Sequence, residues 1–260
     1  IMNFLALGGE EKVTSVLALP ARPPAALQQL RAGNASRSDS GGPKDMGKSP
    51  SSLMLVTKYG VAKKMSSFSF QDVRRSGIIA IRLDKDDQLI SALMTEKGDE
   101  VMVATGGGQS IRFKESDVRE MGRTAGGVSG IKLAPSRGGQ ENDEVIGVDV
   151  IKNDQKKAED GGSFLTMSAN GFGKKTSLKE YKVQKRGGSG VKTAKVTTKT
   201  GKLIVAKVLT GEEEELIAMS KKGQVIRTAL KAIPLLGRQT QGVKIMRLRV
   251  GDSIASLACI

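Results

Sequence analysis

Residues 181–195, YKVQKRGGSGVKTAK, combine five lysines and arginines with three glycines and contain no acidic residue. Cationic side chains bind phosphate oxygens, and a glycine lets backbone N–H groups approach a phosphate because no Cβ intervenes. The stretch is therefore a candidate phosphate-binding loop. A solvated surface loop of the same composition is the alternative.

Basic residues also recur at fixed distances from glycines elsewhere in the chain. One series follows turn glycines by three or four residues, and the other precedes a second set of glycines by four residues. The first series comprises Lys63, Lys64, Arg112, Lys174, Lys175 and Arg227, and the second comprises Arg123, Arg186 and Arg238. Arg74 and Arg75 align loosely with the second series.

The sequence offers little for catalysis. It has no histidine and one cysteine, Cys259, which excludes a Cys/His zinc site, histidine acid–base chemistry and a disulfide within the chain. The stretch SANGFGKKT (168–176) has Ser168 where a phosphate loop needs its first glycine. The carboxylate-rich runs 84–87 and 212–215 are expected in turns rather than around Mg²⁺. We expect no catalytic residue, no metal site and no cofactor here.

The net charge is +15, from 42 Lys and Arg against 27 Asp and Glu. Such an excess favours a polyanionic partner, with nucleic acid ahead of a membrane surface. No apolar run approaches the roughly 20 residues of a membrane-spanning helix, and a single cysteine suits a reducing compartment. We therefore expect a cytoplasmic protein. Because Ile1 is not an initiator methionine, we expect a piece of a longer polypeptide.

Four copies of one pattern contain the first basic series. Each copy joins an apolar strand, through a turn ending in glycine, to a basic strand, and the copies occupy 53–65, 101–113, 164–176 and 216–228. Thr or Ser stands three residues before each turn glycine, which is Gly60, Gly108, Gly171 or Gly223. Two short β-rich runs joined by such a turn predict a hairpin.

A second element follows each hairpin and begins at Gly77, Gly127, Gly190 or Gly242. It continues as an alternating strand, a polar turn and another apolar strand, and residues 1–19 fit a fifth, truncated copy. Four strands in each unit of roughly 50 residues predict an all-β, propeller-like ring of about five to six blades. A linear β-solenoid is the structural alternative. Alternating positions such as Ile79, Ile81, Leu89 and Leu93 are expected to pack between blades.

The chain is predicted to be one domain, 1–260. Residues 21–52 are rich in Pro, Gly and Ser and are predicted to be a flexible insertion inside a blade. Residues 136–143 and 152–163 are predicted to be loops.

A ring places equivalent positions at equivalent radii, so the repeated basic residues predict a basic stripe around its perimeter. Contacts to the regularly spaced phosphates of a duplex fix its path without reading its sequence. Aromatic residues are only 3% of the chain, so stacking on single-stranded bases is not expected. Bent duplex DNA is the predicted ligand. The alternative is a propeller-type protein-interaction scaffold whose charge only keeps it soluble.

Residues 101–133 and 218–248 resemble the C-terminal domain of the DNA gyrase A subunit. Residues 184–190, QKRGGSG, resemble the seven-residue box of that family, Q-[RK]-R-G-G-[RKS]-G. The resemblance covers nearly the whole chain outside 21–52. The repeats are shared with the A subunit of topoisomerase IV, which binds DNA for decatenation and stays an alternative.

The resemblance implies a β-pinwheel, a propeller relative whose blades exchange strands and which wraps DNA. It further implies an enzyme of two A and two B subunits that uses ATP and Mg²⁺, bound elsewhere, to introduce negative supercoils in the bacterial cytoplasm, with the nucleoid. The catalytic tyrosine of that enzyme would lie outside this chain. The residues implied in DNA binding are Gln184, Lys185, Arg186, Gly187, Gly188, Ser189 and Gly190, with Lys192 beside them.

This chain departs from the family pattern in two ways. The box normally lies in the first blade, whereas here it stands beside the penultimate glycine-led element. The family commonly has six blades, whereas this chain has four hairpins. Either a first blade with its own box precedes Ile1, or the lineage has fewer blades. A missing blade would make the role of 184–190 auxiliary.

Overall fold

The computed structural model describes residue 13 and residues 51–70, 77–135, 142–155 and 162–260. The predicted opening copy at 1–19, nearly all of the predicted insertion, and Arg74 and Arg75 lie outside the described residues. Ser52, the last residue of the predicted insertion, is the first residue of a strand.

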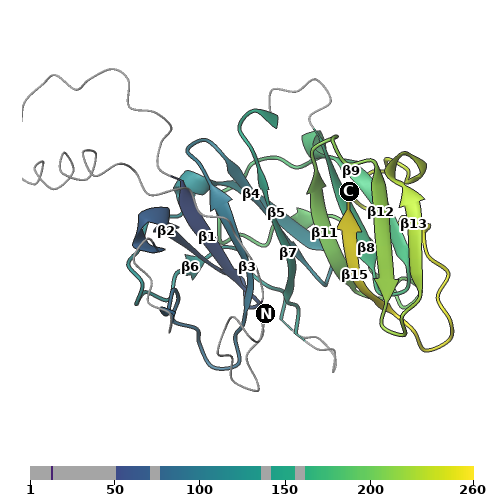
Figure 1. The fold of residues 1–260 in the computed structure, drawn as a ribbon, viewed down its shortest axis with the longest axis horizontal. Helices are drawn as coiled ribbons and strands as arrows, with labels where there is room; N and C mark the ends of the chain where they lie inside the picture. Colours follow the sequence, from purple (N-terminus) through teal and green to yellow (C-terminus); the bar gives the residue numbers. More distant parts are fainter. Residues whose placement is uncertain (1–12, 14–50, 71–76, 136–141, 156–161) are drawn as a thin grey trace, which may run out of the picture.

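Four antiparallel sheets follow one another across the molecule (Figure 1). Each sheet is built on one of the four predicted hairpins. The hairpins are β1 (Ser52–Thr57) with β2 (Val61–Ser66), β4 (Glu100–Thr105) with β5 (Gln109–Lys114), β8 (Ser163–Ser168) with β9 (Phe172–Ser177), and β12 (Glu215–Ser220) with β13 (Val225–Ala229). A strand of six or seven residues pairs with the first strand of each hairpin: β3 (Leu89–Thr95), β7 (Val145–Ile151), β11 (Leu203–Leu209) or β15 (Ile254–Cys259). We call these four the long strands.

The hairpin turns explain the recurring Thr/Ser and Gly. Gly60 has a φ of +83°, and its N–H donates to the carbonyl oxygen of Thr57 at 3.0 Å. The Thr57 hydroxyl oxygen in turn accepts a hydrogen bond from the Val61 N–H at 3.2 Å. A positive φ favours glycine because other residues meet steric strain there. The turn therefore requires both residue types at this spacing.

The fourth strand of a sheet comes from the following unit. β6 (Val128–Ser129) pairs with β2, β10 (Val191–Lys192) with β5, and β14 (Val243–Lys244) with β9. Each of these short strands begins directly after the leading glycine of a second element. This is the strand exchange that the pinwheel resemblance implies, so the predicted fold class is confirmed. Among the described residues, the sheet of β12, β13 and β15 has three strands.

The sheets stack through their long strands. β3 contacts β7, β7 contacts β11, and β11 contacts β15. Apolar side chains fill the space between neighbouring sheets, as where Met54 and Val56 join Val101 and Val103 in one buried cluster. The long strands form one edge of each sheet, which we call the inner edge. The opposite, outer edge is formed by an exchanged short strand in three sheets and by β13 in the described part of the fourth.

The four positions predicted to pack between blades differ. Ile81 is buried, and Leu89 and Leu93 are half-buried. Ile79 has 78% of its surface exposed, so the prediction of a core position is wrong there. Short 3-10 turns end the hairpins: η1 (Ser67–Phe70), η2 (Glu115–Asp117), η4 (Leu178–Glu180) and η5 (Leu230–Ala232). In the described part of the chain, no helix is long and apolar enough to cross a membrane.

Candidate nucleic-acid interface

The outer edge is built from four six-residue segments that begin at the leading glycines. We call them connectors 1 to 4: residues 77–82, 127–132, 190–195 and 242–247. Connector 2 docks on the first hairpin, where the N–H groups of Gly130 and Ile131 both donate to the Gly60 carbonyl, at 2.8 and 3.2 Å. Connectors 3 and 4 bind the carbonyls of Gly108 and Gly171 in the same way.

The connectors are also hydrogen-bonded to one another. The N–H of Lys132, at the end of connector 2, donates to the Gly188 carbonyl, two residues before connector 3, at 2.9 Å. The equivalent bonds join Arg82 to Ala125 at 3.4 Å and Lys195 to Thr240 at 3.1 Å. The four connectors therefore lie side by side along one edge of the molecule, and this ladder fixes the distance from one to the next.

The last residue of every connector is basic and exposed. These residues are Arg82, Lys132, Lys195 and Arg247, and we call them the cation stripe. Within the described ranges, no ion pair involves any of the four side chains. This series was not among the predicted DNA-binding residues. Its signal was a Lys or Arg five residues after each leading glycine.

Two lysines predicted to contact DNA lie inside the protein. Lys63 is fully buried, and its Nζ donates to the carbonyl oxygens of Ala80, Arg123 and Ala125 at 2.7–2.8 Å. Burial lowers the pKa of Lys63. Because its ammonium group fastens connector 1 and the segment that leads into connector 2 to the first hairpin and has no exposed surface, we correct its predicted role from DNA contact to structural tie.

Lys174 is the counterpart of Lys63 in the third hairpin. It is also buried, and its Nζ donates to the carbonyl oxygens of Gly237 and Arg238 at 2.6 Å each and to Thr240 Oγ1 at 3.1 Å. Desolvation by burial lowers the pKa of Lys174 to about 8. The predicted DNA contact is corrected here for the same reason.

Four residues after the turn glycine, each hairpin carries a Lys or Arg. Three of these four side chains form an ion pair with a glutamate. Lys64 Nζ lies 2.7 Å from Glu115 Oε2, and both side chains are largely buried. Arg112 Nε lies 2.6 Å from Glu100 Oε2, and its NH1 donates to the Leu178 carbonyl at 2.9 Å. The predicted DNA contacts by Lys64 and Arg112 are therefore corrected to internal ion pairs. Two residues of the series keep more surface: Arg227 is exposed and paired with Glu215, and Lys175 is half-buried.

In the second predicted series, two members tie units together. Arg186 donates through Nε to the Asp117 carbonyl at 2.8 Å and through NH1 to the Ser129 carbonyl at 3.0 Å. Arg123 is exposed, and its own carbonyl accepts from Lys63.

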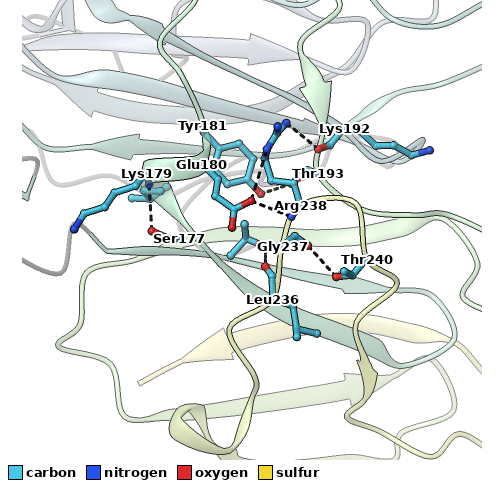
Figure 2. Close-up of polar contacts among 12 residues, drawn as sticks. Ser177, Lys179, Glu180, Tyr181, Lys192, Thr193, Leu236, Gly237, Arg238 and Thr240 are labelled. Atoms are coloured by element: carbon cyan, nitrogen blue, oxygen red, sulfur yellow. Dashed lines mark hydrogen bonds and ion pairs between the residues drawn. The ribbon is translucent and has the colours of Figure 1, made fainter.

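Arg238 makes the equivalent contact one unit later (Figure 2). Its NH1 donates to the Lys192 carbonyl at 3.3 Å, and its backbone N–H donates to Glu180 Oε2 at 3.2 Å. The guanidinium carbon lies 6.0 Å from the centre of the Tyr181 ring, within cation–π range. The Tyr181 hydroxyl is hydrogen-bonded to Thr193 Oγ1, and burial raises the pKa of Tyr181. Arg186 thus connects the third unit to the second, and Arg238 connects the fourth unit to the third.

The backbone of the seven-residue box faces the protein at several points. The Gln184 N–H donates to the Arg112 carbonyl at 2.7 Å, and the Gly187 N–H donates to the Gly130 carbonyl at 2.6 Å. Gly190 has a φ of +71°, and a Cβ there would collide with the carbonyl oxygen of Ser110. The idea that the backbone of Gly187 and Gly190 opens toward a phosphate is corrected to close packing on neighbouring backbone.

Few polar side chains of the box and of the adjacent Lys192 are exposed to solvent. Lys185, Ser189 and Lys192 are exposed, whereas Gln184 and Gly188 are half-buried. The box also lies between connectors 2 and 3 in the ladder, because the Gly188 carbonyl accepts from Lys132. Lys185, Lys192 and the cation stripe therefore occupy the same edge of the molecule.

Comparison with known proteins agrees with this architecture. The family model described as "DNA gyrase C-terminal domain, beta-propeller" matches residues 51–96, 99–152, 162–209 and 214–260. The DNA gyrase A subunit of Staphylococcus epidermidis (strain ATCC 12228 / FDA PCI 1200) is 36% identical over 215 residues, which are 83% of this chain and 23% of that protein. The DNA gyrase A subunit of Ureaplasma parvum serovar 3 is 40% identical over 208 residues, which are 80% of this chain and 23% of that protein.

Solved structures share the fold. A DNA gyrase A C-terminal domain superposes with a TM-score of 0.68 at 27% identity, over 84% of this chain and 68% of that one. The C-terminal domain of DNA topoisomerase IV superposes with a TM-score of 0.72 at 21% identity, over 84% of this chain and 64% of that one. The chain spans about a quarter of the length of the curated relatives described above. Its strand-exchanged sheets and the match over most of its sequence show that the chain belongs to the family of DNA gyrase C-terminal domains.

Proposed function

We propose that this chain binds duplex DNA without reading its sequence and bends it along the outer edge. The observation that carries the proposal is the cation stripe, in which one exposed Lys or Arg ends each of four hydrogen-bonded connectors. Phosphates recur along a duplex, so regularly placed cations contact its backbone without any base readout. Lys185 and Lys192, which are exposed on the same edge, add to these contacts.

The stacking of the sheets supports bending. Because connectors 2 to 4 are docked on hairpins, and all four connectors are joined by the ladder of hydrogen bonds, the cations follow the curvature of the stacked sheets. Bending a 20–30 bp site by 40–90° costs on the order of 1–6 kcal/mol. Charge-assisted contacts from four connectors, with the release of counterions, offset this cost.

At the level of the whole enzyme, we propose that the bound DNA serves ATP-dependent negative supercoiling by a gyrase of two A and two B subunits. The support is the similarity to gyrase A subunits of which this chain spans 23%. Under this proposal the catalytic tyrosine, ATP and Mg²⁺ belong to other parts of the enzyme, and the enzyme acts on the nucleoid in the bacterial cytoplasm. The sequence QKRGGSG favours this role over decatenation by topoisomerase IV.

A topology assay tests wrapping directly. Nicked circular DNA ligated in the presence of the chain is expected to show a linking number different from that of circles ligated alone, because a bound duplex that follows the edge is held in a curved path. The topoisomers are separated on a gel after the protein is removed. Circles with an unchanged distribution at saturating protein would contradict the wrapping proposal.

The stripe predicts a specific loss of salt dependence. The double variant Lys132→Gln/Lys195→Gln is expected to bind duplex DNA more weakly and to lower the slope of log affinity against log salt concentration by about 2, since each phosphate contact contributes about 0.9. The slope is measured by fluorescence anisotropy between 50 and 200 mM salt.

The matched control is Lys97→Gln/Lys221→Gln. Both lysines are exposed, but Lys97 lies between β3 and β4, and the Lys221 N–H donates to the Ser253 carbonyl, next to the inner strand β15. This control is expected to change the slope by much less. Equal slopes for the two double variants would show that total charge, and not the stripe, governs binding.

A further inference from the structure

The turns of three hairpins are capped by an aspartate from the loop that leads into the long strand of the same sheet. The aspartate carboxylate accepts a hydrogen bond from the backbone N–H of the residue before the turn glycine. The pairs are Tyr59 with Asp87 at 3.0 Å, Gly107 with Asp143 at 2.7 Å and Lys222 with Asp252 at 3.1 Å. Each of these turns therefore holds one carboxylate at a fixed place.

The third hairpin keeps this hydrogen bond but has no aspartate in it. The Asn170 N–H donates to the carbonyl oxygen of Thr200 at 2.9 Å. Gly201 stands where the other loops have aspartate, because the carbonyl of the next residue, Lys202, accepts from the Ala169 N–H as the carbonyl after each aspartate does in its own hairpin. A neutral carbonyl performs the same structural task, so this turn forms without the carboxylate of the other three.

The loop of the third hairpin, residues 196–202, is held against the turn by further hydrogen bonds. Asn170 Nδ2 donates to the carbonyl oxygens of Thr198 and Lys199 at 3.3 and 3.0 Å. Gly201 has a φ of +72°, a conformation that favours glycine. The backbone that carries Lys199 is therefore fixed relative to the hairpin.

Two lysines from different elements meet at one aromatic ring. The Nζ atoms of Lys199 and Lys244 lie 5.6 and 4.8 Å from the centre of the Phe172 ring, within cation–π range. Lys199 belongs to the loop and Lys244 to connector 4, and both side chains are exposed. We call these two residues the lysine pair. The other hairpins have no ring at the position of Phe172, where they carry Val61, Gln109 or Gln224.

The lysine pair concentrates positive charge at a turn that has lost its negative charge. In the part of the chain that the structure describes, neither lysine forms an ion pair. Two ammonium groups held near one ring repel each other, and a bound anion relieves this repulsion. The third hairpin turn therefore favours an anionic ligand, whereas the aspartate of the other three turns disfavours one.

The lysine pair adjoins the cation stripe at two points. Lys199 follows the stripe residue Lys195 by four residues, and Lys244 precedes the stripe residue Arg247 by three. The ladder joins connectors 3 and 4 through the N–H of Lys195. The pair thus lies at the turn end of the third hairpin, next to the edge along which the stripe runs.

We propose that the lysine pair is a phosphate-binding site that holds the duplex on the cation stripe at the third hairpin. The site rests on the proposed function, because its ligand is the backbone of that duplex. Lys199 and Lys244 supply the charge, and Phe172 is a positioning residue that keeps both ammonium groups near its ring. The corresponding loop of the first unit, 83–88, has three aspartates and one lysine. The duplex is therefore held more tightly at the third unit than at the first.

The salt dependence of binding tests the site. The double variant Lys199→Gln/Lys244→Gln is expected to bind duplex DNA more weakly and to lower the slope of log affinity against log salt concentration by about 2, since each phosphate contact contributes about 0.9. The slope is measured on the whole chain by fluorescence anisotropy.

The matched control is Lys85→Gln/Lys97→Gln, which removes the same charge. Both lysines are exposed; Lys85 lies in the corresponding loop of the first unit, and Lys97 lies between β3 and β4. This control is expected to leave the slope nearly unchanged. Equal slopes for the two double variants would overturn the site. A slope that falls in Lys132→Gln/Lys195→Gln but not in Lys199→Gln/Lys244→Gln would also overturn it, while the cation stripe and the proposed function stand.

The positioning role of Phe172 is tested by a double-mutant cycle. Phe172→Leu keeps an apolar side chain without a ring and is expected to lower the affinity for DNA about two- to fivefold. The same substitution is expected to have little effect in the Lys199→Gln/Lys244→Gln background, because the ring then has no ammonium group to position. Phe172→Tyr, which keeps a ring, is expected to retain the affinity. Equal losses from Phe172→Leu in both backgrounds would contradict the positioning role.

A photo-cross-link places the DNA without changing any charge of the site. Thr198→Cys, in the exposed part of the loop, carries an azidophenacyl group in a Cys259→Ser chain, and Lys85→Cys and Ser189→Cys are labelled in the same way. Thr198→Cys is expected to cross-link to bound duplex DNA more strongly than Lys85→Cys. A yield no higher than that of Lys85→Cys, while Ser189→Cys in the box does cross-link, would overturn the site alone. No cross-link from any of the three would contradict the proposed DNA binding as well.

Discussion

Replacing Gly190 with alanine is expected to lower the free energy of unfolding by about 2–4 kcal/mol. Gly190 has a φ of +71°, a conformation that strains an L side chain, and a Cβ would collide with the Ser110 carbonyl oxygen. That collision lies at the junction where Val191 pairs with Ser110. The loss is measured by equilibrium unfolding in urea.

Gly188→Ala is the control within the same box. The nearest atom to a Cβ at Gly188 is Ile111 Cδ1 at 3.7 Å, an ordinary van der Waals contact. This variant is expected to keep nearly full stability. If Gly190→Ala folds as stably as Gly188→Ala, the backbone packing ascribed to the box is wrong. DNA affinity measured on the folded fraction then separates a structural role of the glycines from a contact role.

Lys174→Met is expected to destabilise the chain by about 3 kcal/mol at neutral pH, because it leaves buried oxygen atoms without a donor. The Lys174 ammonium group donates to two carbonyls and to Thr240 Oγ1, all in the segment that leads into connector 4. Lys175→Met, one residue later on a half-buried side chain, is expected to cost much less. Thermal unfolding of both variants measures the loss of stability. Equal losses for the two variants would contradict the structural role of the Lys174 ammonium group.

The same lysine gives stability a dependence on pH. The pKa of Lys174 is about 8 in the folded chain, below its ordinary value of 10.5. Between these values the unfolded chain binds more protons than the folded one, so stability contributed by this residue rises as the pH increases from 8 to 10.5. Wild type minus Lys174→Met is therefore expected to show this rise. A difference that stays flat over that range would contradict the lowered pKa.

The hairpins and the blade-like units could be predicted from the sequence because their signals are local. A Thr or Ser, a glycine three residues later and flanking β-rich runs specify the turn at Gly60, and the same backbone requirement recurs in each copy. The turn glycines and the leading glycines recur with the same period, and this shared period gives the number of hairpins. The register of the short exchanged strands could not be predicted, because two residues carry too little alternation to show which face is buried.

Whether a basic residue of a hairpin can contact DNA depends on whether its side chain is buried. The spacing of the basic residues in the sequence does not show this. Lys63 and Lys174 have the same position relative to the turn glycine as Ile111 and Ile226. A position that carries isoleucine in two copies points inward, and a lysine there must place its ammonium group among internal acceptors. That comparison would have separated Lys63 and Lys174 from the surface cations.

Two of the arginines before the leading glycines, Arg186 and Arg238, bond to backbone carbonyls of the preceding unit. Their spacing predicts a common edge, and the ladder between Lys132 and Gly188 provides it. Contacts such as that of Arg186 with Ser129 depend on how two units pack, and those units are distant in sequence. The last connector position was not predicted, although a Lys or Arg stands five residues after each leading glycine.

The exchange of strands has a consequence for how the chain folds and changes. Removing one unit would take away its own hairpin and also the outer strand of the preceding sheet, so local unfolding in one unit exposes the edge of its neighbour. Local unfolding of one unit is therefore coupled to that of its neighbour, unlike the unfolding of independent domains joined by linkers. Because connectors 2, 3 and 4 dock in the same register, recombination that adds or deletes one complete unit is expected to rejoin compatible ends.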